Sequence, residues 1–359
     1  DQAHFEAERL PPTPVRGKAA ALQPWRLLRE VELPPAAPLI GRDEELRHAR
    51  SALQACIDAR AARWVVIRGE PGIGKSRLLL EIGALARASG AALLHAAVPD
   101  FGPARGAVAL RTLAHGLLQL PAQADAAQLG ARLAAAHLDG LPQAHVLALL
   151  GHDVPEPLRA AYAALDSAAR ERGSADALVA LLHQRCADGP LLLALEDLHW
   201  AEAPVLAQLA RIAAGCRDLP LLLAVTTRPQ SEGFDSARRV HAGGLPALTL
   251  DLNALGSDAA HQLAQHLAGG DAELARCCAA RAGGNPLFLE QLLRQARETL
   301  RDALPGSIQS LVLARLDRLA PADKAAVQAA SVLGQRFALE AWGALVDAPR
   351  LEPLVDAGL

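Results

Sequence analysis

Short apolar runs alternate with longer amphipathic stretches along most of this chain. The runs of strand length are residues 64–67, 91–98, 191–195 and 221–225. Between them, leucine and alanine recur at helical spacing, as they do over residues 43–60 after an acidic first turn. Strands that alternate with helices predict an α/β fold with a parallel sheet and helices on both of its faces.

Three regions depart from this alternation. Residues from about 103 to 188 are Ala- and Leu-rich helical segments separated by Pro and Gly, which predicts a helical insertion between two strands. Beyond Leu252 no further strand is evident, and helices carry the chain to Leu359. Residues 1–37 are rich in proline, so we expect an extended linker there, with one short strand at residues 25–31.

Residues 69–76 match the pattern GxxxxGK[ST], with a predicted strand before it and a predicted helix after it. The glycines let the backbone wrap so that its N–H groups point at phosphate oxygens, and the helix N-terminus adds positive potential. In this pattern the lysine reaches the β- and γ-phosphates and the serine binds Mg²⁺. The predicted nucleotide contacts are Gly69, Glu70, Pro71, Gly72, Ile73, Gly74, Lys75, Ser76 and Arg77. Only three of the 36 basic residues are lysines, so Lys75 is not explained by composition.

A nucleotide-binding loop of this kind needs a carboxylate at the end of a neighbouring strand. The apolar run 191–195 ends in Glu196 and Asp197. In the usual order the first acid holds the metal and the second polarises water, but Glu196 is longer than the customary Asp, so both assignments stay open. Arg228 follows the run 221–225; it is either a γ-phosphate sensor at the carboxyl end of a strand or a surface arginine before Pro229.

Five elements occur in an order that resembles the STAND signalling ATPases of the AAA+ class. They are residues 39–46 (LIGRDEEL), 69–76 (GEPGIGKS), 196–202 (EDLHWAE), 226–228 (TTR) and 284–290 (GNPLFLE). More narrowly, the chain is similar to the Orc1-like ATPase module of bacterial multidomain adenylate/guanylate cyclases and of large LuxR-type regulators. The resemblance covers residues 38–359 and implies ATP or ADP with Mg²⁺ as ligands, the metal being held through Ser76, Glu196 and Asp197.

The resemblance also implies roles for residues outside the loop. It places Ile40, Gly41 and Arg42 beside the adenine and Pro286 against the nucleotide, on a helical lid. It divides the chain into a P-loop ATPase core at residues 38–235, the lid at 236–303 and the start of a winged-helix-like domain at 304–359. Without the family, residues 41–42 are a turn before a helix and residues 283–286 a loop between helices.

The N-terminal residues bear on the kind of protein that contains this module. Residues 10–18 (LPPTPVRGK) and 24–28 (PWRLL) are similar to the tail that closes class III nucleotide cyclase domains, with Arg16 in place of a lysine. A generic linker is the alternative. Since 37 residues cannot contain the metal-binding aspartates of a cyclase, we expect no cyclase activity from this chain.

Composition and charge exclude several other classes. A net charge of −3 argues against a dedicated nucleic-acid binder. The five cysteines show no metal-ligand spacing, which favours buried, reduced thiols in a cytoplasmic protein. No apolar run reaches the roughly 18–20 residues of a membrane span. The lack of methionine, and an apolar helical pattern around Leu351 and Leu354, lead us to expect a piece of a longer protein.

These observations predict a nucleotide-dependent switch that hydrolyses ATP slowly. Lys75, Arg228 and a metal on Ser76 would stabilise the γ-phosphate charge, while Glu196 or Asp197 polarises the water. The nucleotide state would pass to a neighbouring cyclase-like effector domain, and nucleotide-dependent oligomers fit this class. The alternatives are the ATP-sensing module of a large LuxR-type regulator and an origin-recognition-like DNA loader, which the charge disfavours.

Overall fold

The computed structural model describes residues 5–9, 25–30, 38–99, 105–120, 124–229, 244–298, 316, 319–333, 337, 339–346, 351 and 354. The chain divides into two compact units, Asp1–Pro38 and Leu39–Leu359. In the first unit, β1 (Phe5–Arg9) pairs antiparallel with β2 (Trp25–Glu30). The predicted strand at residues 25–31 is confirmed as β2. The expectation that the rest of residues 1–37 is extended linker is wrong for β1. Residues 10–18, which resemble a cyclase tail, lie outside the described residues.

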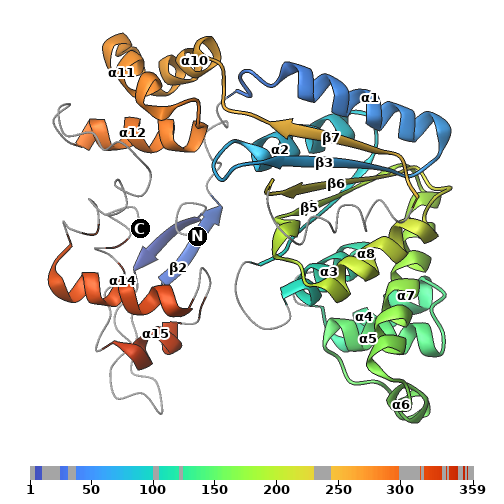
Figure 1. Cartoon of the computed structure of the whole chain (residues 1–359). Helices are drawn as coiled ribbons and strands as arrows, with labels where there is room; N and C mark the ends of the chain where they lie inside the picture. Colours follow the sequence, from blue (N-terminus) through green and yellow to red (C-terminus); the bar gives the residue numbers. More distant parts are fainter. Residues whose placement is uncertain are drawn as a thin grey trace. The chain divides into compact units, whose positions relative to one another are not determined.

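A five-stranded parallel sheet forms the centre of the second unit (Figure 1). Its strands are β3 (Arg63–Gly69), β4 (Ala92–Ala97), β5 (Leu191–Glu196), β6 (Leu221–Thr227) and β7 (Ala247–Leu252). Across the sheet their order is β4-β5-β6-β3-β7, and all neighbouring pairs are parallel. All five strands therefore end at the same edge. The α/β fold predicted from the sequence is confirmed.

Strand β7 lies in a stretch for which only helices were predicted. Leu250 and Leu252 are buried, whereas Thr249 and Asp251 are exposed, as expected for an edge strand with one covered face. Asp251 also accepts two hydrogen bonds of 2.6 Å from Arg68 on β3. Residues 236–303, which we assigned to a helical lid, thus include a strand of the sheet.

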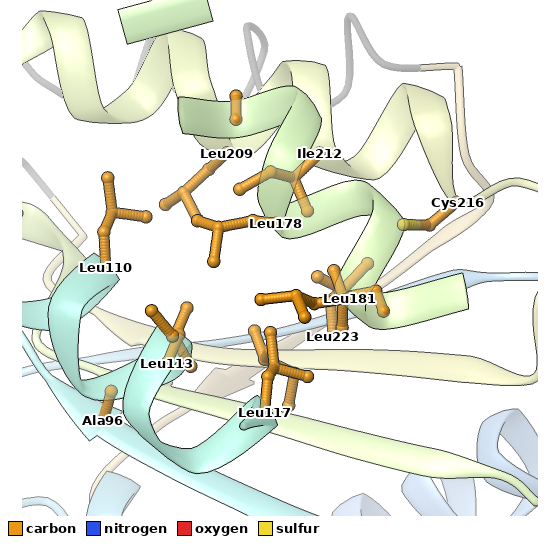
Figure 2. Packing of buried hydrophobic residues seen from close by; sticks show 14 of the residues in the cluster. Ala96, Leu110, Leu113, Leu117, Leu178, Leu181, Leu209, Ile212, Cys216 and Leu223 are labelled. Carbon is orange, nitrogen blue, oxygen red and sulfur yellow. The ribbon is translucent and has the colours of Figure 1, made fainter. Parts of the chain in front are cut away.

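Helices cover both faces of the sheet. On one face lie α1 (Asp43–Ala59) and α2 (Lys75–Ala88); on the other lie α3 (Arg105–Leu117), α7 (Ser167–Ala187) and α8 (Ala203–Gly215). Along β6, Leu223 and Val225 face one core while Leu222 and Ala224 face the other. Figure 2 shows Leu223 beneath side chains of α3, α7 and α8. Because both faces are buried, the inner strands are continuous apolar runs rather than alternating ones.

Between β4 and β5 the chain passes through α3, α4 (Ala126–Ala135), α5 (Leu141–Leu150), α6 (Glu156–Ala163) and α7. These helices occupy the region where a helical insertion was expected. Proline and glycine stand near the ends of these helices, because proline suits the first turn of a helix and glycine adopts the left-handed conformation that ends one. For example, α5 has a proline in its first turn and ends at Gly151 in the left-handed conformation (φ 84°).

After β7 come α10 (Ser257–Ala268), α11 (Ala272–Ala282) and α12 (Pro286–Glu298), which pack against one another.

Further on, α14 (Pro321–Leu333) and α15 (Leu339–Leu345) meet at the buried Trp342, whose indole N–H donates to Ala326 O at 2.8 Å. Most of residues 304–359, for which a winged-helix-like domain was predicted, lie outside the described residues. Within the described ranges, no helix has both the length and the apolar character to cross a membrane.

Candidate nucleotide-binding site

The predicted phosphate-binding loop connects β3 to α2 at the carboxyl edge of the sheet. Strand β3 ends at Gly69, and Gly74 caps the N-terminus of α2. Gly72 and Gly74 have φ values of 77° and 101°, a region that favours glycine. The loop therefore leads directly into a helix N-terminus, where unpaired backbone N–H groups favour an anion.

Lys75 lies folded over this loop. Its Nζ donates to the carbonyl oxygens of Gly69 at 2.9 Å and Glu70 at 3.0 Å, and the residue is only 9% exposed. Burial lowers the pKa of the Lys75 ammonium, and the nearby negative charge of Asp197 partly offsets this effect. A phosphate at the loop would be a stronger acceptor for this ammonium than two neutral carbonyls.

Ser76 and Glu196 meet although they are far apart in the sequence. The Ser76 hydroxyl donates to Glu196 Oε2, and Glu196 Oε1 lies 2.7 Å from Nε2 of His95 on β4. The pKa of the Glu196 carboxyl is lowered, first by the hydrogen bond with His95 and then by that with Ser76, against the effect of burial. A serine hydroxyl and an ionised carboxylate are the oxygen donors that Mg²⁺ prefers.

Asp197 follows Glu196 at the end of β5 and has an unusual backbone conformation. It has a left-handed conformation (φ 55°), and its N–H donates to Thr226 Oγ1 on β6 at 2.9 Å. Its Oδ1 lies 3.9 Å from Nδ1 of His199. The two acids of the predicted pair therefore have different surroundings: Glu196 faces Ser76, while Asp197 lies near Lys75 and His199.

Arg228 and two residues that follow the acids form a cluster beside them. The Arg228 guanidinium lies over the Trp200 ring, 5.1 Å from its centroid, and the rings of Trp200 and His199 are 4.7 Å apart. Burial, together with the charges of Arg228 and Lys75, lowers the pKa of His199 to about 4. Both ring nitrogens of His199 are buried, and neither has a hydrogen-bond partner among the described residues.

Arg42 lies beneath the loop. The guanidinium is buried and donates to the carbonyl oxygens of Ile73 at 3.2 Å and Asn253 at 2.6 Å. Next to it, Gly41 has a φ of 69°, and a Cβ there would lie 2.5 Å from Ala259 Cβ on α10. Arg42 thus joins the loop to the end of β7. The contact of Ile40, Gly41 and Arg42 with an adenine stays a prediction.

The start of α12 contacts the loop directly. Asn285 donates from Nδ2 to Pro71 O at 3.0 Å, and the backbone N–H of Leu287 donates to Gly72 O at 3.2 Å. Asn285 Oδ1 also accepts from the N–H of Phe288 at 3.1 Å, which satisfies one free donor of the first turn. Pro286, for which a nucleotide contact was predicted, is half-buried at the first position of the helix.

Residues 38–224, more than half of the chain, match the family described as the AAA ATPase domain. The chain belongs to this family. The P-loop ATPase module predicted from the sequence is thereby confirmed at the level of this AAA ATPase domain.

One curated protein is similar to most of this chain. The "Uncharacterized protein R02095" of Rhizobium meliloti (strain 1021) is 28% identical over 332 residues, which are 86% of this chain and 31% of that protein. The AAA ATPase chain thus spans about a third of the length of this curated relative.

Two solved structures are also similar to the chain. The Orc1 protein of Aeropyrum pernix in complex with DNA has a TM-score of 0.48 and 17% identity, over 90% of this chain and 84% of that chain. A STAND protein with a tetratricopeptide repeat sensor from Pyrococcus horikoshii has a TM-score of 0.48 and 18% identity, over 91% and 40%.

The structure adds residues beside the predicted loop and acids to which no role was assigned from the sequence. His95, His199, Trp200 and Asn285 all lie at the site. Three of them stand inside the quoted segments 196–202 and 284–290, so the motifs could have pointed to them. His95 lies in a strand without any motif, and only its contact with Glu196 reveals it.

Proposed function

We propose that this chain is a switch module that binds ATP with Mg²⁺ and hydrolyses it slowly. The observation that carries this proposal is the contact between Ser76 at the start of α2 and Glu196 at the end of β5. It places a hydroxyl and a carboxylate beside the loop that would hold the phosphates. Among the described residues no group of three or more His, Cys, Asp or Glu could hold a metal ion. Mg²⁺ that binds together with a nucleotide typically keeps few protein ligands.

The surroundings of each residue suggest its role. Ser76 and Glu196 would hold Mg²⁺, which supplies positive charge to the β- and γ-phosphates. Lys75 would exchange its two carbonyl partners for phosphate oxygens. Asp197, which lies near Lys75 and His199, would accept a hydrogen bond from the attacking water, and Arg228 would stabilise charge on the γ-phosphate.

The switch itself would act through α12. Because the N–H of Leu287 and the side chain of Asn285 bond to loop carbonyls, a change in the loop reaches α10–α12 directly. We infer that this group passes the nucleotide state to an effector domain in the same chain. The resemblance of residues 10–18 to a cyclase tail favours a cyclase-like protein, with a LuxR-type regulator as the alternative host.

Replacing Lys75 tests the proposed phosphate site. Lys75→Ala should abolish ATP binding in a calorimetric titration, because the β- and γ-phosphate charge loses its fixed partner. The matched control is Arg87→Ala, which removes one exposed positive charge from the last turn of the same helix. We expect this control to bind ATP as the parent does. Unchanged affinity in Lys75→Ala would refute the assignment of the loop.

A further inference from the structure

His95 and Glu196 lie on neighbouring strands and on the same face of the sheet. In the parallel pairing of β4 with β5, His95 is opposite Ala194, two residues before Glu196. Side chains two apart in a strand point to the same face, so His95 and Glu196 lie on the same face of the sheet. Their contact, 2.7 Å between Nε2 and Oε1, therefore follows from the register of the sheet.

The contact with His95 restrains the Glu196 side chain, which Ser76 also contacts. A glutamate has one more rotatable bond than an aspartate, so more side-chain entropy is lost when it is held in one orientation. Here both oxygens are engaged, Oε1 by His95 and Oε2 by Ser76. His95 thus selects the rotamer that turns the second oxygen toward Ser76.

The contact between His95 and Glu196 contributes little to the stability of the folded protein, so stability does not explain why the pair is present. The His95 side chain is 47% exposed, and pairs with such an exposed member contribute little to folding, because solvent screens them. The Glu196 side chain is only 17% exposed, so its orientation depends on its few partners. The pair also lies at the edge where the fold presents the phosphate-binding loop.

We propose that His95 is a positioning residue for the metal-binding carboxylate of Glu196, and that it sets how strongly Mg²⁺ enhances nucleotide binding. The inference rests on the proposed function, since it assumes that Ser76 and Glu196 receive the metal with ATP. Groups that orient a metal ligand in this way typically change metal affinity about 10–100-fold when removed.

The test measures ATP affinity by calorimetry over a series of Mg²⁺ concentrations and, separately, in EDTA. His95→Ala should need about tenfold more Mg²⁺ to reach half of the full enhancement, with its affinity in EDTA unchanged. His95→Gln keeps an N–H donor and should recover most of the response. The control His152→Ala removes an exposed histidine outside the site and should behave as the parent. Thermal midpoints should agree among all variants.

Each outcome separates the two proposals. If the parent chain binds no ATP with Mg²⁺, the proposed function and this inference both fail. If the parent binds ATP and His95→Ala has the parental Mg²⁺ dependence, only the role of His95 is refuted. An equal loss of affinity with Mg²⁺ and in EDTA would also refute it, because His95 would then support the fold of the loop rather than the carboxylate.

Discussion

Four buried thiols couple the stability of this protein to alkaline pH. Burial raises the pKa values of Cys56 and Cys216 to about 12 and those of Cys186 and Cys278 to about 11. In the unfolded chain these thiols ionise near the ordinary value of 9.0. Above this pH the unfolded state therefore binds fewer protons than the folded state, and stability falls as pH rises. Each thiol should lower the free energy of unfolding by up to about 1.4 kcal/mol per pH unit.

Urea denaturation between pH 8 and 10 measures this slope. A Cys216→Ala variant should show a shallower decline than the parent, because one of the four buried thiols is gone. Identical slopes would mean that Cys216 ionises alike in the folded and unfolded chains.

Site residues that belong to a sequence motif could be predicted from the sequence. Residues that reach the site only because two strands pair in a particular register could not. Lys75 and Ser76 occupy fixed positions in a local pattern, and Glu196 ends an obvious apolar strand. His95 shows no local sign of its role, because its partner is 101 residues away and the two meet only through the pairing of β4 with β5. The hydrogen bonds of Arg42 join the loop to Asn253, a link that no sequence pattern indicated, and its predicted place beside an adenine stays a prediction.

At the scale of elements, the close approach of α12 to the loop depends on Gly72. A Cβ at Gly72 would lie 2.8 Å from both Asn285 Oδ1 and Leu287 Cβ, whereas a Cβ at Gly74 would meet nothing within 4 Å. Both glycines have positive φ, so alanine strains either one by about 1 kcal/mol. Only Gly72→Ala should also push α12 away from the loop.

Hydrogen exchange of the nucleotide-free protein tests this difference. In Gly72→Ala, backbone amides in the first turns of α12 should exchange faster, because the bond from the Leu287 N–H to Gly72 O is weakened. In Gly74→Ala, the matched control, they should exchange as in the parent. Equal protection in both variants would show that α12 does not depend on the loop for its position.

A strand could be predicted from the sequence where its burial produces a simple pattern of apolar residues. The inner strands β5 and β6 are covered on both faces, which requires continuous apolar runs. The edge strand β7 has one covered face, so Thr249 and Asp251 interrupt its leucines and a search for apolar runs misses it. Alternation over Leu248, Leu250 and Leu252 was the signal that could have found it.

At the scale of the whole molecule, the site belongs to one of the two units. The loop, the acids, His95, Arg228 and the start of α12 all come from Leu39–Leu359, and they converge because the strand order brings the ends of β3, β5 and β6 to one edge. We therefore expect a chain that begins at Leu39 to bind ATP with the affinity of the full chain in a calorimetric titration. Lys75→Ala in the shortened chain should again abolish binding. Loss of binding in a shortened chain that keeps its helical circular dichroism would show that residues 1–38 contribute to the site, and would make the N-terminal unit part of the nucleotide response rather than a neighbour of it.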